Sequence, residues 1–116
     1  MGDVLSKEQR RAVRQARKLI SHKSHLCKSD ILAATADGKR CDVSSDFAVC
    51  FSVTGALARG FLNGKRNCDA SNEIHKAREL IQKLLPKGLF LWNILQREGL
   101  KGVHQLFDEA LDLEPV

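Results

Sequence analysis

The central stretch of the chain reads FAVCFSVTGALAR over residues 47–59, and it carries no charge before Arg59. A helix that is apolar on every side is typical of a buried central element. The polar residues 44–46, Ser-Ser-Asp, supply N-cap candidates in front of the stretch, and Gly60 supplies a stop behind it. Gly55 inside the run indicates that another backbone passes close by. We therefore expect a central buried helix around which the other elements pack.

Upstream of this stretch, the pattern predicts an amphipathic helix over about 7–21. Ser6 and Gln9 have the spacing of a capping box, and the residues that follow are good helix formers. A step of about 100° per residue separates the side chains into two groups. The apolar group comprises Leu5, Ala12, Val13, Ala16, Leu19 and Ile20. The cationic group comprises Lys7, Arg10, Arg11, Arg14, Arg17 and Lys18. The helix therefore has one side to bury and one nearly pure cationic side to expose.

Between these two helices, Asp37-Gly38 is a strong turn signal. It predicts a β-hairpin over about 27–43, although residues 31–34 are equally compatible with a helical turn. A two-residue turn at Asp37 and Gly38 would place Ala34 opposite Cys41. Since a lone hairpin is only marginally stable, it is expected to lie against the helices.

Downstream, a third helix is expected to begin at Asp69 or Ser71 and to end before Pro86. Its apolar residues repeat at intervals of three and four, namely Ile74, Ala77, Leu80, Ile81, Leu84 and Leu85. A short apolar segment over 89–95 is predicted to be helical and to close at Gly99, and a last helix is predicted over about 101–113. The fold class is therefore α+β and mostly α, a single domain over 1–116 with four to five helices and one small hairpin.

Composition and charge narrow the class of protein. The chain has 116 residues, 43% of them hydrophobic, which suits one small soluble domain. Its polar and basic N-terminus excludes a signal peptide and no run could span a membrane, so a cytoplasmic location is expected. The net charge is +5, but residues 1–28 alone carry +6 and residues 29–116 carry −1. Four carboxylates then close the chain, at Asp108, Glu109, Asp112 and Glu114. The excess of positive charge therefore belongs to the first predicted helix.

Metal and catalytic signals are weak. The four cysteines contain no C-x-x-C pair and are interpreted as small buried hydrophobes. His22, His25 and Cys27 form an H-x-x-H-x-C cluster that could hold zinc, with Cys41 or Cys68 as a fourth ligand, or could equally be a polar loop. There is no nucleophile or phosphate-binding motif, and His75 and His104 have no catalytic partners in the pattern. No catalytic residue and no cofactor are therefore assigned.

The run Gly55-Ala56-Leu57-Ala58-Arg59 carries a resemblance. Together with Asp37-Gly38 before it, and with Trp92-Asn93 and LFDEAL over 106–111 after it, this run resembles a small domain family of unknown function found in bacterial and phage genomes. That family usually has C-x-x-G-A-L in its central helix, where this chain has Ser52 in place of the cysteine. The resemblance implies no activity, and it favours a phage-type accessory protein.

The most legible functional feature is the cationic side of the first helix. We expect a small non-enzymatic interaction or regulatory protein that binds an acidic macromolecule through Arg10, Arg11, Arg14, Arg17 and Lys18. An acidic protein is the favoured partner, and a nucleic acid contacting the same side is the alternative. The basic first helix and the acidic last helix could also meet, either between two copies in a homo-oligomer or within one chain.

Overall fold

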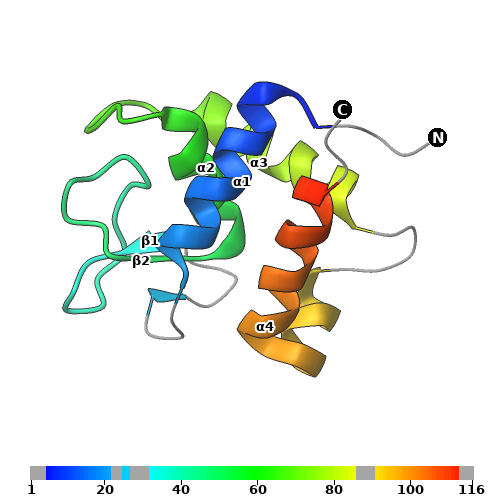
Figure 1. Ribbon diagram of the computed structural model, residues 1–116. Helices are drawn as coiled ribbons and strands as arrows, with labels where there is room; N and C mark the ends of the chain where they lie inside the picture. Colours follow the sequence, from blue (N-terminus) through cyan, green and yellow to red (C-terminus); the bar gives the residue numbers. More distant parts are fainter. Residues whose placement is uncertain (1–4, 22–24, 27–31, 86–90, 113–116) are drawn as a thin grey trace.

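The computed structural model of the chain describes residues 5–21, 25–26, 32–85 and 91–112, without side chains at 91–98 and 112. The described part is a mostly helical α+β fold, as the sequence predicted (Figure 1). Its elements, in chain order, are α1 (Lys7–Leu19), β1 (Ala33–Ala34), β2 (Cys50–Phe51), α2 (Val53–Leu62), α3 (Ser71–Leu84) and α4 (Leu91–Asp112).

The first helix begins with the predicted capping box. The Ser6 hydroxyl accepts from the Gln9 backbone N–H at 3.1 Å, and the Gln9 side chain accepts from the Ser6 backbone N–H at 2.9 Å. Two backbone donors that the first turn leaves without helical partners are thereby satisfied. The predicted helix over 7–21 is confirmed, with its end at Leu19.

The central helix α2 begins later than the sequence pattern suggested. Ser52 is its N-cap and accepts from the Gly55 N–H at 3.0 Å, while the two residues before it form β2. The expected start of the central helix at 44–47 is therefore wrong, because the apolar run forms first a strand and then a helix. The expected stop at Gly60 is also wrong, since the helix continues to Leu62 and ends at Asn63 in a left-handed conformation.

Two glycines let other segments approach α2 closely. A Cβ atom added at Gly55 would lie 1.8 Å from the Leu32 carbonyl oxygen, which confirms the predicted passage of a second backbone. A Cβ at Gly60 would lie 2.6 Å from the Ala12 carbonyl oxygen of α1. Gly60 is thus the point where α1 crosses α2, a role that its position near a helix end concealed.

The small sheet pairs segments other than those expected. β1 and β2 are antiparallel, with Ala33 opposite Phe51 and Ala34 opposite Cys50. The predicted partner segment, 39–43, contributes one antiparallel bridge, from Arg40 to Ala34 rather than from Cys41. The predicted residues 27–31 lie outside the described part of the chain.

The Asp37-Gly38 turn accounts for this register. The Thr35 N–H donates to the Lys39 carbonyl at 2.8 Å and the Gly38 N–H donates to the Thr35 carbonyl at 3.0 Å, and Gly38 has a φ of 85°. A turn closed by a left-handed glycine makes a three-residue loop over 36–38, where the prediction assumed two. One extra loop residue shifts the pairing by one position.

The remaining helices follow their predicted boundaries. Next to the start of α3, Asp69 accepts from both the backbone N–H and the hydroxyl of Ser71. The N-cap residue is Ala70, without a side-chain cap bond, so the predicted cap at Asp69 or Ser71 is wrong. α4 is interrupted at Gly99, whose φ of 63° and ψ of −147° are not helical. The two predicted helices on either side of Gly99 are therefore two halves of α4.

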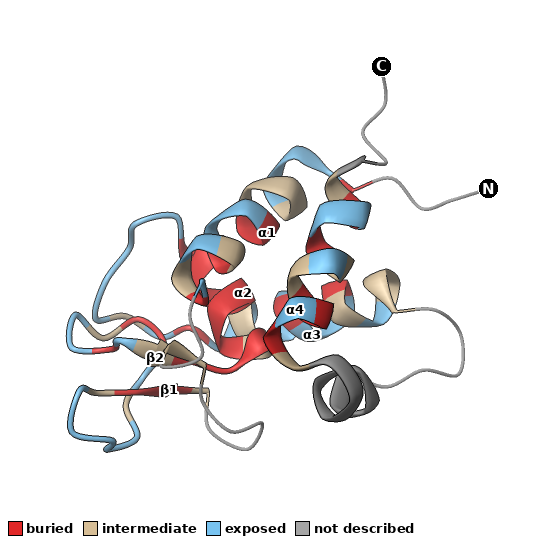
Figure 2. Cartoon of the chain, turned by 60° about the horizontal axis from the view of Figure 1, so that its bottom comes forward, coloured by how far each residue is buried: buried red, intermediate tan, exposed pale blue. Residues whose placement is uncertain are grey.

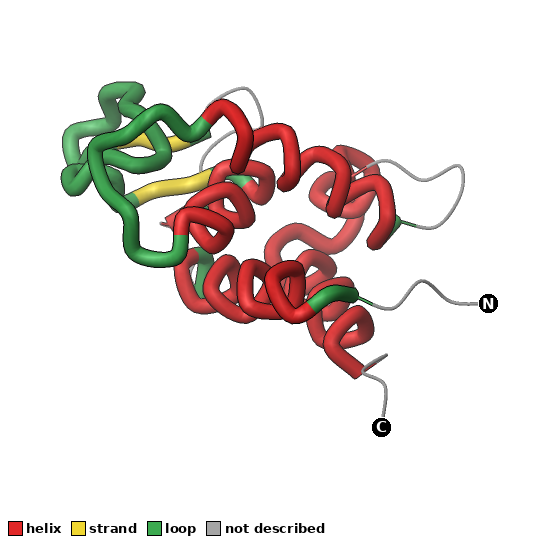
Figure 3. The backbone as a smooth tube through the Cα atoms, turned by 90° about the horizontal axis from the view of Figure 1, so that it is seen from above, coloured by secondary structure: helices red, strands yellow, loops and turns green. Residues whose placement is uncertain are grey.

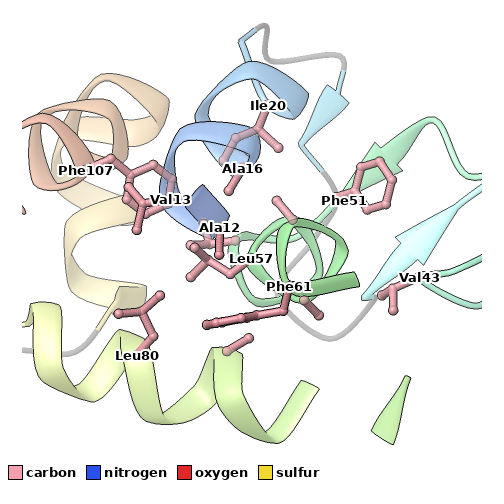
Figure 4. Packing of buried hydrophobic residues seen from close by; sticks show 14 of the residues in the cluster. Ala12, Val13, Ala16, Ile20, Val43, Phe51, Leu57, Phe61, Leu80 and Phe107 are labelled. Carbon is pink, nitrogen blue, oxygen red and sulfur yellow. The ribbon is translucent and has the colours of Figure 1, made fainter. Parts of the chain in front are cut away.

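The hydrophobic core is centred on α2, against which α1 and α3 pack directly, while α4 packs against α1 and α3 (Figures 2 and 4). Its largest fully buried side chains include Val13, Ile20, Phe51, Leu57, Leu80 and Phe107. The strands and most loops gather at one end of the molecule (Figure 3). None of the helices in the described ranges is long and apolar enough to cross a bilayer.

Candidate binding surface on the first helix

The cationic side of α1 faces away from the core. Ala12, Val13 and Ala16 are buried on the inner side of the helix, whereas Lys7, Arg14 and Lys18 are exposed on the outer side. Figure 2 shows the same division along α1, with the outward turns pale blue and the inward turns red. Because α1 packs on the body along its whole inner side, the exposed cations project from a rigid base. We name the residues Lys7, Arg14 and Lys18 the α1 basic surface.

Arg17 is engaged within the chain. Its Nε donates to Asp108 Oδ1 at 2.7 Å and its Nη2 donates to Oδ2 at 3.1 Å. Two parallel bonds of this kind match the planar fork of the guanidinium to the carboxylate. The basic first helix and the acidic last helix therefore meet within one chain at this pair. Arg17, which the sequence placed among the partner-binding residues, has a partner already.

Arg10 and Arg11 are half-buried rather than fully exposed. Arg10 donates through Nε and Nη2 to the Leu5 carbonyl oxygen, each at 3.3 Å. The Nε atom of Arg11 is buried without a hydrogen-bond partner in the described part of the chain. Both guanidinium groups are thus held close to the helix, and the five predicted binding residues do not form one uniformly exposed stripe.

Two polar contacts between α1 and α3 lie along the other side of the α1 basic surface. Glu8 accepts from Lys76 Nζ at 3.1 Å, and Gln9 accepts from Lys83 Nζ at 3.3 Å. Lys76 also lies 5.9 Å from the centre of the Phe61 ring. Sequence spacing alone does not reveal these links, because the paired residues are far apart in the chain.

The predicted zinc cluster lies mostly outside the described residues. His25 is half-buried next to Leu26, while His22 and Cys27 belong to the part left undescribed. Within the described ranges, no group of three or more His, Cys, Asp or Glu side chains could hold a metal ion. The zinc hypothesis at His22, His25 and Cys27 stays a prediction.

The described cysteines are free and half-buried. Cys41 and Cys68 pack against the core, which fits their interpretation as small hydrophobes more closely than a ligand role. Burial, followed by the nearby Asp42, raises the pKa of the Cys41 thiol. A raised pKa keeps this thiol protonated, so it is a poor nucleophile at neutral pH.

A buried arginine braces the loop over 42–49. Arg59 of α2 is only 8% exposed, and its Nη1 donates to the carbonyls of Val43 at 2.7 Å and of Ser45 at 2.8 Å. Its guanidinium carbon lies 5.6 Å from the centre of the Phe51 ring. Burial, followed by the nearby Arg66, lowers the pKa of Arg59. The only sequence signal for this role was a single charge that closes an apolar run.

The braced loop exposes two apolar side chains. Phe47 is 77% exposed and Val49 is 47% exposed, while Ala48 between them is buried. Two hydrogen bonds tie this loop to residues 67 and 68. The Ser44 hydroxyl donates to the Cys68 carbonyl at 2.7 Å, and the Asn67 N–H donates to the Ser44 carbonyl at 2.8 Å. The prediction that Phe47 lies in a buried helix is therefore wrong.

No protein-family model matches the chain, and no curated protein or solved structure is significantly similar to it. The resemblance to the small bacterial and phage domain family accordingly stays an expectation from the sequence.

Proposed function

We propose that the protein is a small binding protein, of an interaction or regulatory kind, that captures an acidic macromolecular partner through the α1 basic surface. The observation that supports it best is the outward position of Lys7, Arg14 and Lys18 on a helix whose inner side is fully packed. Cations on a rigid base lose little freedom when they meet a partner, and they steer an oppositely charged molecule toward the surface.

The neighbourhood of this surface also supports a carboxylate-bearing partner. Lys7 and Lys18 are exposed and form no ion pair with the residues that the structure describes. Arg17, next to Lys18 on the helix, already binds a carboxylate, because it holds the Asp108 side chain through two bonds. We therefore favour an acidic protein segment over a nucleic acid.

The test compares two triple variants that have the same change in net charge. Lys7→Glu, Arg14→Glu and Lys18→Glu reverse the α1 basic surface, whereas the control, Lys65→Glu, Arg78→Glu and Lys101→Glu, reverses exposed cations on other segments. Binding of fluorescent poly-L-glutamate is measured by anisotropy at about 50 mM salt, where screening is weak.

The α1 variant is expected to bind poly-L-glutamate at least tenfold more weakly than the unsubstituted protein, whereas the control variant should keep most of its affinity. Close charge pairs dominate the attraction. Equal loss in both variants would mean that only the net charge matters, and would refute a defined surface. A duplex DNA measured in parallel decides the alternative: tighter binding to DNA than to polyglutamate, with a steep loss as salt rises, would make the protein a nucleic-acid binder.

A further inference from the structure

The pair between Arg17 and Asp108 places a carboxylate of the chain itself at the edge of the α1 basic surface. Arg17 lies three residues after Arg14 on the same helix, so their side chains are neighbours. A partner that covers Arg14 and Lys18 would also reach the guanidinium of Arg17. Arg17 is therefore already paired with a carboxylate, the same chemical group that the proposed partner would bring.

This internal pair can open without displacing α4 from the core. The Arg17 and Asp108 side chains are 41% and 51% exposed, and exposed pairs of this kind hold weakly. Apolar contacts fix α4 independently, because Val103 and Phe107 are fully buried in the core cluster. A second polar contact, between His104 Nε2 and the Ile20 carbonyl at 2.9 Å, joins α4 to the end of α1. Release of Asp108 therefore leaves the helix packing in place.

We propose that Asp108 competes with the partner for Arg17, and that a carboxylate of the partner replaces the Asp108 carboxylate on the Arg17 guanidinium. The inference rests on the proposed function and adds a regulatory element to it. Free Arg17 is available only while the internal pair is open, so the pair lowers the apparent affinity for the partner. It also sets a chemical requirement, because only an anion able to accept both guanidinium bonds replaces Asp108 without loss.

Two isosteric variants on α4 separate local competition from a general charge effect. Asp108→Asn and Glu109→Gln each remove one negative charge from neighbouring exposed positions. Glu109 accepts from Gln105 on its own helix at 3.2 Å and is the matched control. Binding of poly-L-glutamate to the full chain is measured by anisotropy. Asp108→Asn should bind about two- to sixfold tighter than the unsubstituted protein, the range that release of an exposed pair permits, and Glu109→Gln should change by less than about twofold.

A third variant tests whether the effect passes through Arg17. Arg17→Lys keeps the charge but removes the fork, so in that background Asp108→Asn should give a smaller gain. If the protein binds polyglutamate but the two α4 variants gain equally, the competitor is refuted and the binding function stands. If neither the protein nor Asp108→Asn binds, the binding function itself fails and the inference falls with it. Binding by Asp108→Asn alone would support both, with the internal pair masking the site.

Discussion

At the scale of single residues, Arg59 is the side chain whose role departs most from its position in the sequence. It follows a run of uncharged residues, and it stays inside the fold to hold the carbonyls of Val43 and Ser45. Burial of a cation is costly unless its donors are used, and here one nitrogen serves two carbonyls beside an aromatic ring. The two hydrogen bonds to the loop carbonyls offset part of this cost.

Substitution of Arg59 by Met tests this bracing role. Met keeps much of the side-chain volume, but it leaves the Val43 carbonyl without the Arg59 donor and the Ser45 carbonyl with only the Ala48 N–H at 3.2 Å. The free energy of unfolding should therefore fall by about 2 kcal/mol. Urea denaturation followed by circular dichroism measures the change. Arg66→Met is the control, because Arg66 pairs with Asp46 at 3.6 Å on the surface and its loss should cost under about 1 kcal/mol. Equal losses in the two variants would show that Arg59 contributes no more than a surface ion pair.

At the scale of elements, the boundaries of the helices are set by polar groups close to them in sequence. Ser6 at the start of α1 and Ser52 at the start of α2 are examples. Next to the start of α3, the carboxylate of Asp69 accepts two hydrogen bonds from Ser71. The bond from the Ser71 hydroxyl, followed by the bond from its backbone N–H, lowers the pKa of Asp69. A carboxylate with a lowered pKa stabilises the fold above its unfolded-state pKa, and this contribution is lost as the pH falls through the folded-state pKa.

Removal of the Ser71 hydroxyl should therefore change how Asp69 titrates. In Ser71→Ala the midpoint of the Asp69 carboxyl, followed by NMR, should rise toward the ordinary aspartate value. The stability difference between this variant and the unsubstituted protein should shrink as the pH falls through the folded-state pKa. Ser71→Thr keeps a hydroxyl and should keep the low midpoint. An unchanged midpoint in Ser71→Ala would assign the lowered pKa of Asp69 to the backbone N–H bond of residue 71 rather than to the hydroxyl.

At the scale of the whole molecule, the last helix, α4, lies against the first helix, α1. α4 packs against α1 through buried apolar residues and adds the Arg17–Asp108 pair and the contact from His104 to Ile20. The opposite charges at the two ends of the sequence are thereby partly matched inside one chain. The Cα radius of gyration is 13.4 Å, the value expected for a compact chain of this length.

Light scattering at two salt concentrations tests this intrachain pairing. If the α1–α4 contact forms within one chain, the mass should stay near the 12.9 kDa of one chain at both about 50 mM and about 1 M salt. A mass of two chains that falls to one as the salt rises would instead place the charge pairing between copies.

Features set by nearby residues were predictable from the sequence. The capping box at Ser6 and the break at Gly99 each depend on a few adjacent residues, and each was predicted correctly. The close approach at Gly55 was also predictable, because a glycine inside an apolar helix has few other reasons to be there. The outward position of Lys7, Arg14 and Lys18 likewise follows from helical periodicity.

Features that depend on residues far apart in the chain were not predictable from the sequence. The apolar run over 47–59 fits a strand, a loop or a helix equally well by composition, and only the pairing of β2 with β1 divides it. The burial of Arg59 and the exposure of Phe47 follow from that division.

By itself, the sequence determined the helical class of this protein, the ends of most helices and the cationic side of α1, since these depend on local backbone hydrogen bonds and side-chain periodicity. Only the tertiary structure decided which of those cations remain exposed. Arg17 meets Asp108 across 91 residues of chain, and such a contact arises from the packing of α4 on α1. No local window contains both partners, so the part of the basic side left for another molecule could not be read from the sequence.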